Sequence, residues 1–372
     1  MKAPFPIPYC LNVHPAADWR ATKRALDVHA LAVKKLVAPD RPFPLSLHLG
    51  YRTALELANP RRRAAFRDWL RRHDCFVAGI NAFPFGPFHA ATVKADVYRP
   101  DWRSSERLAY TLLVARLLAD LIPEGAETTL TTVPGGWRPD WKTAADHRLA
   151  LKNLARAAAG CRDVFETTGR RIRIAVEPEP GCAWDLFAPE IEAAGPEIGW
   201  CLDACHAAVD FRPLARLPWK RIVRVQLSAA IECDNVPAAR AALAPFVEPR
   251  YLHQTRAFLD GEIIGAWPDL GPALKALPKL PAQAVVRAHC HVPLTWAGSG
   301  PLRSTRGQLT SAFFAKARRV FCEVETYTLD VLPRALRPRA RARTIAGELA
   351  WAAARYGLSS STNRKIVSPG LA

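Results

Sequence analysis

Short apolar runs alternate with amphipathic stretches along the first two thirds of this chain. The apolar runs are bounded by proline, glycine or polar residues, which is typical of buried strands. We expect strands at residues 9–14, 45–50, 77–83, 128–133, 173–177, 199–203 and 222–227. Pro8 and Pro15 bracket the first of these runs, because proline can continue neither a sheet ladder nor a helix.

Helical patterns fill the intervals between these runs. Asp18 can cap a helix in which Leu26, Ala30 and Val33 recur at helical spacing, and further helices are expected at 61–73, about 104–121, 143–167 and 189–194. Alternating strands and helices call for parallel strands joined by right-handed crossovers. Because no GxGxxG motif follows the first strand, the pattern favours an α/β fold of the (β/α)8 TIM barrel type over a doubly wound sheet.

The last third of the chain holds one strand-like run too many for a regular barrel. Runs at 284–292 and 319–326 flank a helical pattern at about 304–316. We expect 320–325 to close the barrel and 284–292 to belong to a long insertion after the seventh strand. That insertion, about 229–283, should contain helices and the cluster YLHQ and cap the barrel mouth. The sequence thus predicts one barrel domain over 1–358, with a final helix to about Tyr356, and a polar tail at 359–372.

Carboxylates and imidazoles collect where predicted strands end. Glu177 and Glu179 lie two residues apart in VEPEPG, and the interleaved prolines keep the backbone extended, so both side chains face one side. Taken singly, such pairs also fit an acidic loop, a helix cap, an exposed strand edge or a half-buried strand. Their shared position favours a functional site, because barrel enzymes assemble their sites at the C-terminal ends of the strands. The other pairs are Asp203 and His206, His289 and His291 in HCHVP, and Glu323 and Glu325 in CEVET.

Several carboxylates in a partly dry pocket need a compensating cation or protons. A divalent metal ion is the economical solution, and mixed Glu, Asp and His ligands suit Mn²⁺, Zn²⁺, Mg²⁺ or Fe²⁺ without choosing among them. Such an ion could polarise a carbonyl or hydroxyl group, or supply hydroxide, while a spare side chain moves protons. The candidates for proton transfer are Glu179, His289 and His291. Candidate substrate contacts in the loops are His14, Asn81, His89, Trp137 and His253.

The composition is that of a globular protein, with 49% hydrophobic and 23% charged residues over 372 positions. No apolar run approaches the roughly 18 residues of a membrane helix, and the N-terminus MKAPFPIPYC lacks an apolar signal core, so we expect a cytoplasmic protein. The nine cysteines show no CxxC spacing, which favours reduced thiols. The net charge of +18 permits nucleic-acid binding, but the excess is mostly arginine on predicted helix faces, so we favour a solvated surface.

The segment CLDACHA resembles the Asp-x-x-His segment of the xylose isomerase-like barrels, a superfamily of sugar isomerases and epimerases that also includes the endonuclease IV DNA-repair enzymes. The resemblance implies metal ligands at Glu177 after the fifth strand, Asp203 and His206 after the sixth, and Glu325 at the eighth. Where such proteins usually place a histidine on the seventh strand, this chain has Gln226, whose amide oxygen is a weaker, uncharged ligand. The completeness of a site with two or three metals therefore stays open, and His289 or His291 could supply the missing imidazole.

A narrower resemblance covers nearly the whole chain. It is to the EboE family of metabolite traffic proteins, which are xylose isomerase-like barrels from a bacterial gene cluster. The resemblance implies handling of a small metabolite, with other proteins of the cluster as candidate partners, and brings no established reaction. The segments that carry it are, in order, YCLNVHP, GINAFPFGPFH, VYRPDW, TVPGGW, VEPEPGC, CLDACH, YLHQ, HCHVPL and VETYTLDVLP.

Three functions fit these features. The first is a metal-dependent enzyme that isomerises or epimerises a small polyhydroxylated or carbonyl-bearing metabolite, with Glu177, Asp203 and Glu325 holding the ion and His206 and Gln226 as ligands or substrate contacts. The second is a binding or carrier protein that keeps the pocket without turnover, and Gln226 is the best argument for it. The third is an endonuclease IV-like nuclease, which the positive charge favours and Gln226 disfavours.

Overall fold

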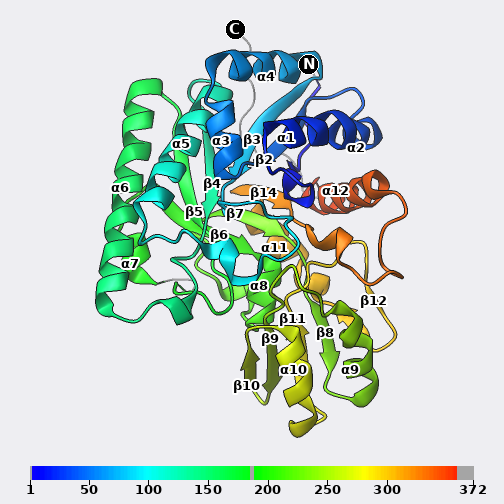
Figure 1. The fold of residues 1–372 in the computed structure, drawn as a ribbon. Helices are drawn as coiled ribbons and strands as arrows, with labels where there is room; N and C mark the ends of the chain where they lie inside the picture. The colour runs from blue at the N-terminus through cyan, green and yellow to red at the C-terminus, as the bar shows by residue number, and fades with distance from the viewer. Residues whose placement is uncertain (1, 185–187, 358–372) are drawn as a thin grey trace.

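The computed structural model describes residues 2–184 and 188–357, and within them eight parallel strands close into a barrel. Sequential strands are neighbours, and the last strand lies between the first and the seventh (Figure 1). The predicted (β/α)8 fold is therefore confirmed. The strands are β1 (Tyr9–Cys10), β2 (Phe43–His48), β3 (Cys75–Asn81), β4 (Glu127–Thr132), β5 (Arg171–Val176), β6 (Ile198–Asp203), β7 (Ile222–Leu227) and β14 (Phe321–Val324).

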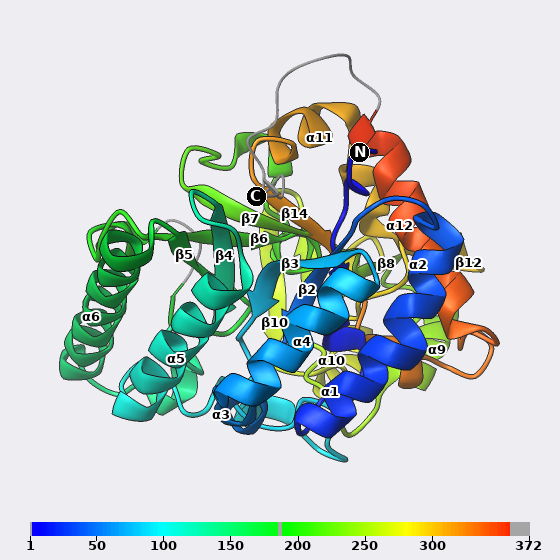
Figure 2. The same ribbon diagram turned by 90° about the horizontal axis from the view of Figure 1, so that it is seen from above.

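Helices cover the outside of the barrel in the intervals between strands. Asp18 caps α1 by accepting a backbone N–H in its first turn, as the sequence predicted, and Ser104 caps α5 in the same way. Figure 2 shows the last helix beside one of the first, so the helical layer closes where the barrel does. The helices are α1 (Trp19–Ala25), α2 (Leu31–Val37), α3 (Tyr51–Leu57), α4 (Pro60–Arg72), α5 (Ser105–Leu121), α6 (Ala144–Thr168), α7 (Pro189–Glu192), α8 (Ala204–Val209), α11 (Ser311–Ala317) and α12 (Arg341–Gly357), with a π-helical turn (Leu26–Ala30) joining α1 to α2.

The inside of the barrel contains a buried arginine with polar partners on several strands. Arg224 on β7 is fully buried there, and its Nη2 atom donates to Ser46 Oγ on β2 at 2.9 Å. Its Nη1 atom donates to the backbone oxygens of Ile80 on β3 and Thr129 on β4, at 3.2 and 3.3 Å. Its Nε atom donates to Glu323 on β14 at 2.9 Å. One guanidinium therefore ties five strands together from the inside.

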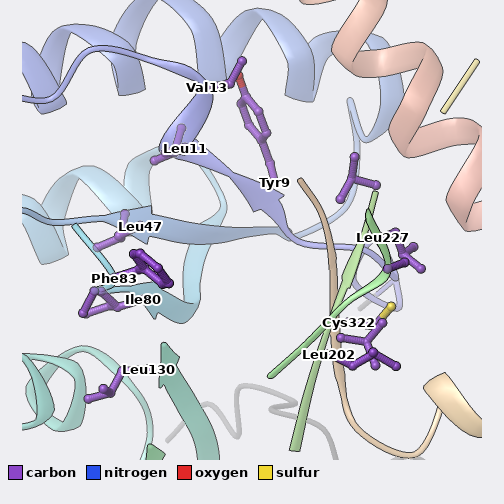
Figure 3. Close-up of a cluster of buried hydrophobic side chains, with 14 of the residues drawn as sticks. Tyr9, Leu11, Val13, Leu47, Ile80, Phe83, Leu130, Leu202, Leu227 and Cys322 are labelled. Atoms are coloured by element: carbon purple, nitrogen blue, oxygen red, sulfur yellow. The ribbon is translucent and has the colours of Figure 1, made fainter. Parts of the chain in front are cut away.

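Side chains alternate along each strand, so the residues between these interior positions point outward. Leu47, Ile80, Leu130, Leu202 and Leu227 are buried apolar residues of this outward set, and Figure 3 shows them in one cluster with their neighbours. The outward set packs beneath the helices and supplies the hydrophobic core. The inward set includes apolar residues such as Phe321, whose ring contacts Arg224, and polar residues that continue toward the C-terminal ends of the strands.

The insertion after the seventh strand carries a second sheet of its own, which lies at one end of the barrel (Figure 1). The sheet is antiparallel, with the strand order β10-β9-β11-β8-β13-β12. The run predicted at 284–292 supplies one of its strands, β11, while the other strands of this sheet were not predicted. The elements are β8 (Ile231–Asp234), α9 (Pro237–Leu243), β9 (Thr255–Leu259), β10 (Glu262–Trp267), α10 (Leu270–Ala276), β11 (Val285–Ala288), β12 (Gly298–Ser299) and β13 (Leu302–Ser304).

Two predicted elements are shorter than expected. The first strand ends at Cys10, because the N–H of His14 donates to the oxygen of Leu11 at 3.1 Å and turns the chain. The helix predicted at 304–316 covers only α11, because Leu302–Ser304 pairs with β8 as a strand and Thr310 caps a new helix. The predicted tail at 359–372 lies outside the described residues. Among the residues that are described, no helix is both long and apolar enough to span a membrane.

Candidate metal centre

Three carboxylates meet where β5, β6 and β14 end. Glu177 follows β5, Asp203 is the last residue of β6, and Glu325 follows β14. All three are buried, and one oxygen atom of each lies within 4.8 Å of the other two. Oxygen atoms gathered in this way are the ligands that a hard divalent cation takes.

Neighbouring groups orient these carboxylates but leave part of their hydrogen-bonding capacity unused. Asp203 Oδ1 accepts from the His206 backbone N–H at 2.8 Å and from Ser228 Oγ at 2.9 Å, while Asn12 donates to Glu325 Oε1. Asp203 Oδ2 and Glu325 Oε2 are buried and have no hydrogen-bond partner among the described residues. Buried carboxylate oxygens without partners are costly, so these two atoms fit a cation as the missing partner.

Burial also shifts the protonation of these groups. It raises the pKa of Glu177 to about 8, an effect that His206 opposes and Asp203 reinforces. Burial, together with the charges of Glu177 and Asp203, raises the pKa of Glu325 well above its usual value. Without a cation, Glu177 would therefore hold a proton at neutral pH, and Glu325 would ionise less readily than an ordinary glutamate, whereas a divalent ion would favour the ionised form of both.

The structure separates the two glutamates of CEVET. Glu323 accepts from Arg224 inside the barrel, whereas Glu325 lies one interior position further along and belongs to the carboxylate group. Because Arg224 is already paired with Glu323, it is not the counter-ion of the carboxylate group. The ion pair thus forms a polar layer directly beneath the candidate centre.

Three imidazoles form a second group beside the carboxylates. His206 lies on α8, whereas His289 and His291 follow β11 in the insertion. The Nε2 atom of His289 lies 3.1 Å from that of His206 and 3.0 Å from that of His291. Burial lowers the pKa of His291 to about 4 and that of His289 well below its usual value. Burial acts to lower the pKa of His206 too, but the charge of Asp203 and two neighbouring glutamates outweighs it and raises the pKa.

Residues of the insertion hold the imidazoles in place. Gln254 accepts from His289 Nδ1 through Oε1 at 2.5 Å and donates from Nε2 to Glu179 at 2.8 Å. His253 lies between Glu248 Oε1, 3.0 Å from its Nε2, and the backbone oxygen of His289, 2.6 Å from its Nδ1. Burial opposes the charge of His253, but contacts with Cys290, Glu248 and that oxygen raise its pKa well above the usual value. His253 thus fixes the backbone of His289 by linking it to Glu248.

A pocket opens beside the two groups. Its walls come from the loop after β3 and from the insertion, which Lys94 ties together through its Nζ atom. That atom donates to the oxygens of Glu248 at 2.9 Å and Tyr251 at 2.7 Å, and to Asp269 Oδ2 at 2.6 Å. Aromatic and polar side chains together suit a small polar ligand. The lining includes Asn81, Phe88, Tyr98, Glu177, Glu179, His206, Tyr251, Glu325 and Tyr327.

The residues predicted to contact substrate fall in different places. Asn81 lines the pocket. His89 lies outside the pocket lining. Its Nε2 atom is 2.6 Å from the backbone oxygen of Asn12, and its Nδ1 atom is 3.1 Å from the Tyr251 hydroxyl. Trp137 stacks on Tyr98 with ring centroids 5.3 Å apart and so supports the pocket from outside its lining.

His14 lies apart from the pocket. It lines a separate depression together with His29, on which its ring stacks at 4.2 Å between centroids. Gln226 does lie beside the carboxylates, but it donates from Nε2 to Glu177 Oε2 at 3.2 Å. Its Oε1 atom accepts from Cys201 Sγ at 3.1 Å, so in this arrangement Gln226 holds a ligand in place instead of offering one.

The sequence reasoning missed the residues that orient the site. Asn12, Ser228 and Gln254 position Glu325, Asp203 and His289, respectively. Asn12 lies in YCLNVHP and Gln254 in YLHQ, so both belong to motifs that the sequence singled out without a role for these residues. Ser228 could have been found from its spacing, because it stands two residues after the inward-facing Gln226.

Comparisons with known proteins add distant likenesses in fold. No protein-family model matches the chain, and no curated protein matches it. Solved structures similar to it include the IOLI protein with a bound zinc atom, at 13% identity over 97% of this chain and 100% of that one, with a TM-score of 0.47. The probable 3-DHS dehydratase AsbF, involved in petrobactin synthesis in Bacillus anthracis, is 10% identical over 95% of this chain and 98% of that one, with a TM-score of 0.42.

A third similar structure is D-psicose 3-epimerase with D-tagatose from Clostridium cellulolyticum H10. It is 13% identical over 61% of this chain and 72% of that one, with a TM-score of 0.39. Likenesses this distant assign no activity, metal or substrate to this chain. Its chemistry has to be derived from its own side chains.

Proposed function

We propose that this protein is a metal-dependent barrel enzyme that isomerises or epimerises a small polyhydroxylated or carbonyl-bearing metabolite. The observation that carries the proposal is the group of three buried carboxylates, Glu177, Asp203 and Glu325, whose oxygens lie within 4.8 Å of one another beside a pocket. Two of their oxygens have no partner among the described residues, which is the arrangement a cation would complete. Three buried carboxyl groups at one point are costly whether they are ionised or protonated without hydrogen-bond partners, and a packed core alone does not require them.

A divalent ion held by the three carboxylates would supply polarisation of a substrate carbonyl or hydroxyl group. Glu179 lines the pocket and is fixed by the amide N–H of Gln254, so its carboxylate can take or return a proton at a neighbouring substrate carbon. His206 lines the same pocket and presents its ring between Glu179 and Asp203. Glu179 and His206 can thus move protons in the pocket, and the other two candidates are His289, which contacts His206, and His291, which contacts His289.

The pocket wall supports a substrate of modest size and mixed character. Tyr98, Tyr251 and Tyr327 place ring surfaces and hydroxyl groups around the same space, and Asn81 adds an amide. Rings can pack against the carbon-bound faces of a sugar-like molecule, while hydroxyl and amide groups bind its oxygens. A long or highly charged polymer has no matching groups in this lining.

The order of motifs that resembles the EboE family extends the proposal to a cellular role. We propose that the protein handles a small metabolite in a metabolite traffic pathway, in the cytoplasm, with other products of the same gene cluster as partners. Nucleic acid is not proposed as a partner. The carboxylates of the pocket repel a polyanion, and Lys94 in the lining is already paired with Asp269.

A carrier without turnover is the second candidate, and one contact favours it. Gln226 donates its amide N–H to Glu177 Oε2, so this carboxylate oxygen is satisfied without an ion. A carrier protein could keep this hydrogen bond, because a pocket used only for binding does not need Glu177 as a metal ligand. The two candidates differ in whether the carboxylate group takes up metal.

Elemental analysis of the purified full chain tests the proposal. We expect a divalent metal in the wild type, loss of that metal in Asp203→Ala, and no change in Asp163→Ala, an exposed carboxylate on α6 that serves as the control. Incubation of the loaded protein with ketohexoses and aldoses in D₂O should then place deuterium at a substrate carbon. Metal-free protein that still binds a sugar would favour the carrier, and cleavage of abasic-site DNA would favour the nuclease.

A further inference from the structure

A depression away from the pocket collects charged side chains from the first and the last helices of the barrel. It lies where the loop after β1, helix α1 and the start of α12 come together, and its volume of about 450 Å³ has room for a small molecule. It shares no lining residue with the pocket beside the carboxylate group. The charged residues of the lining are Asp18, Arg20, Arg24, Asp330 and Arg341.

Two of these arginines lack a counter-ion. Arg20 and Arg24 lie four residues apart on α1, so their guanidinium groups share one face of the helix and repel each other. Neither forms an ion pair with a carboxylate of the described residues. The carboxylates of the lining have other partners, since Asp18 Oδ1 accepts from the Ala21 backbone N–H at 2.8 Å and Asp330 pairs with Arg341. The charges of Arg20 and Arg24 are therefore available to a ligand.

His14 adds a hydrogen-bonding group without a partner to the same lining. Burial, with help from the charges of His29 and Arg341, lowers the pKa of His14 to about 2, so the ring is neutral. Its Nε2 atom contacts the Tyr9 hydroxyl, which has no other partner in the described part of the chain. The hydroxyl therefore donates to Nε2, and the hydrogen of the ring lies on Nδ1. That Nδ1 atom is buried and has no hydrogen-bond partner among the described residues.

These groups have the chemistry of an oxyanion site. A guanidinium group presents its N–H donors in a planar fork that matches the oxygens of a phosphate group, and the charge strengthens each hydrogen bond. The Nδ1–H group of His14 needs an acceptor, which a further oxygen of the same ligand can supply. A metal ion does not fit here, because the arginines repel a cation.

We infer that this depression binds a phosphate group, free or carried by a small molecule, through Arg20, Arg24 and His14. The inference goes beyond the proposed function, because the ligand sits outside the pocket. The two places are nevertheless joined by a short turn. Asn12 precedes His14 by two residues and donates to Glu325, so the ligand binds against the turn that orients one carboxylate of the candidate metal centre.

Calorimetric titration of the metal-stripped full chain at low ionic strength tests the inference. Removing metal ensures that a phosphate probe does not bind to an ion in the pocket. The probes are inorganic phosphate and glycerol 3-phosphate, and the one that binds more tightly distinguishes free phosphate from a phosphate monoester. We expect saturable binding that weakens with added NaCl and becomes at least about tenfold weaker in Arg20→Gln and in Arg24→Gln. His14→Phe keeps a buried ring without Nδ1 and should weaken binding severalfold.

The matched control removes the same charge elsewhere. Arg148→Gln/Arg156→Gln changes two exposed arginines of α6, which lies on the other side of the barrel from α1 and α12 (Figures 1 and 2), and should bind phosphate like the wild type. Arg20→Gln/Arg24→Gln, its counterpart in the depression, should abolish binding. Because both arginines are exposed, we expect this variant to fold even if His14→Phe does not.

Glu325→Gln separates the inference from the proposed function. It alters the carboxylate group and leaves the lining of the depression intact, so phosphate binding should persist whether or not the protein takes up metal. A chain that binds phosphate through the arginines but takes up no metal would refute the proposed function and support the inference. Absence of saturable binding of either probe, or binding that Arg20→Gln/Arg24→Gln leaves unchanged, would overturn the inference.

Discussion

Arg224 and Glu323 form an ion pair inside the barrel, with Arg224 Nε 2.9 Å from Glu323 Oε1 and both side chains fully shielded from solvent. Glu323 lies on β14 and Glu325 follows two residues later, directly after the strand, so both carboxylates face the barrel interior. The two residues look alike in the sequence CEVET. Glu323 pairs with Arg224 and therefore has a structural role, whereas Glu325 lies with Glu177 and Asp203 in the candidate metal centre.

The first prediction contrasts these two glutamates. Glu323→Gln leaves the Arg224 guanidinium buried without its counter-ion, so we expect the free energy of unfolding to fall by roughly 3–5 kcal/mol. Glu325→Gln replaces a carboxyl group that already tends to hold a proton, so the metal-free protein should be as stable as the wild type or more stable. Urea unfolding of the metal-free proteins measures both. Equal losses in the two variants would contradict this assignment of roles.

The second prediction concerns protons released by metal. Burial raises the pKa of Glu177 to about 8, so this group must lose a proton at pH 7 before it can act as a ligand, and the pKa of Glu325 is raised in the same direction. Loading the stripped protein with Zn²⁺ should therefore release protons, and the apparent affinity should rise as the pH increases toward 8. Calorimetry in buffers of different ionisation enthalpy counts the protons. Glu177→Gln should release fewer, and no release from the wild type would contradict the placement of the ion.

The third prediction concerns the clamp between the loop after β3 and the insertion. Lys94 Nζ donates to two backbone oxygens and to Asp269, so Lys94→Met should cost on the order of 2–3 kcal/mol of stability. Hydrogen exchange should also become faster at the backbone amides of 248–252. Lys316→Met is the control, since its Nζ donates to the single backbone oxygen of Ala215 at an exposed position, and its stability should change by less than about 0.5 kcal/mol. Equal exchange in wild type and Lys94→Met would show that other contacts hold the pocket wall.

The barrel could be predicted because its signals are local. Prolines and glycines bracket the strands, helical periodicity fills the intervals, and β7 matches its predicted bounds residue for residue. The strands of the insertion have weaker periodicity. β10, for example, lies at the edge of the second sheet and is partly exposed, so its residues show no clean alternation of apolar and polar side chains. Its pairing with β9 does have a local signal that the prediction missed, because Asp260 and Gly261, both at positive φ, form the two-residue turn between the strands.

The candidate site was predictable in part for the same reason. Glu177, Asp203 and Glu325 could be picked out because parallel strands bring their C-terminal ends to one face of a barrel. Asn12 and Gln254 could not be identified from the sequence, because their roles depend on residues far along the chain. Asn12 positions Glu325, and Gln254 positions His289. His14, which was also predicted to contact substrate, lies elsewhere in the fold. It follows a barrel strand, but the turn after Cys10 directs it into a separate depression.

The last prediction tests a buried carboxyl group away from the pocket lining. Glu348 on α12 accepts from Thr326 Oγ1 at 2.7 Å and from the backbone N–H of Leu294 at 2.8 Å. Burial raises the pKa of Glu348 from 4.5 to about 7, although these hydrogen bonds oppose the shift. The folded chain thus holds this proton more tightly than the unfolded chain. Its contribution to stability is complete below about pH 4.5 and is lost as the pH rises through about 7.

Glu348→Gln should remove this pH dependence, because the amide keeps the accepting oxygen and carries no charge. We expect the variant to match the wild type at pH 4.5 and to exceed its free energy of unfolding at pH 8 by roughly 3 kcal/mol. Urea unfolding at several pH values between these limits measures the difference, with the exposed Glu166→Gln on α6 as the control. A difference that stays constant with pH would mean that Glu348 is ionised throughout. In that case its two hydrogen bonds would outweigh its burial.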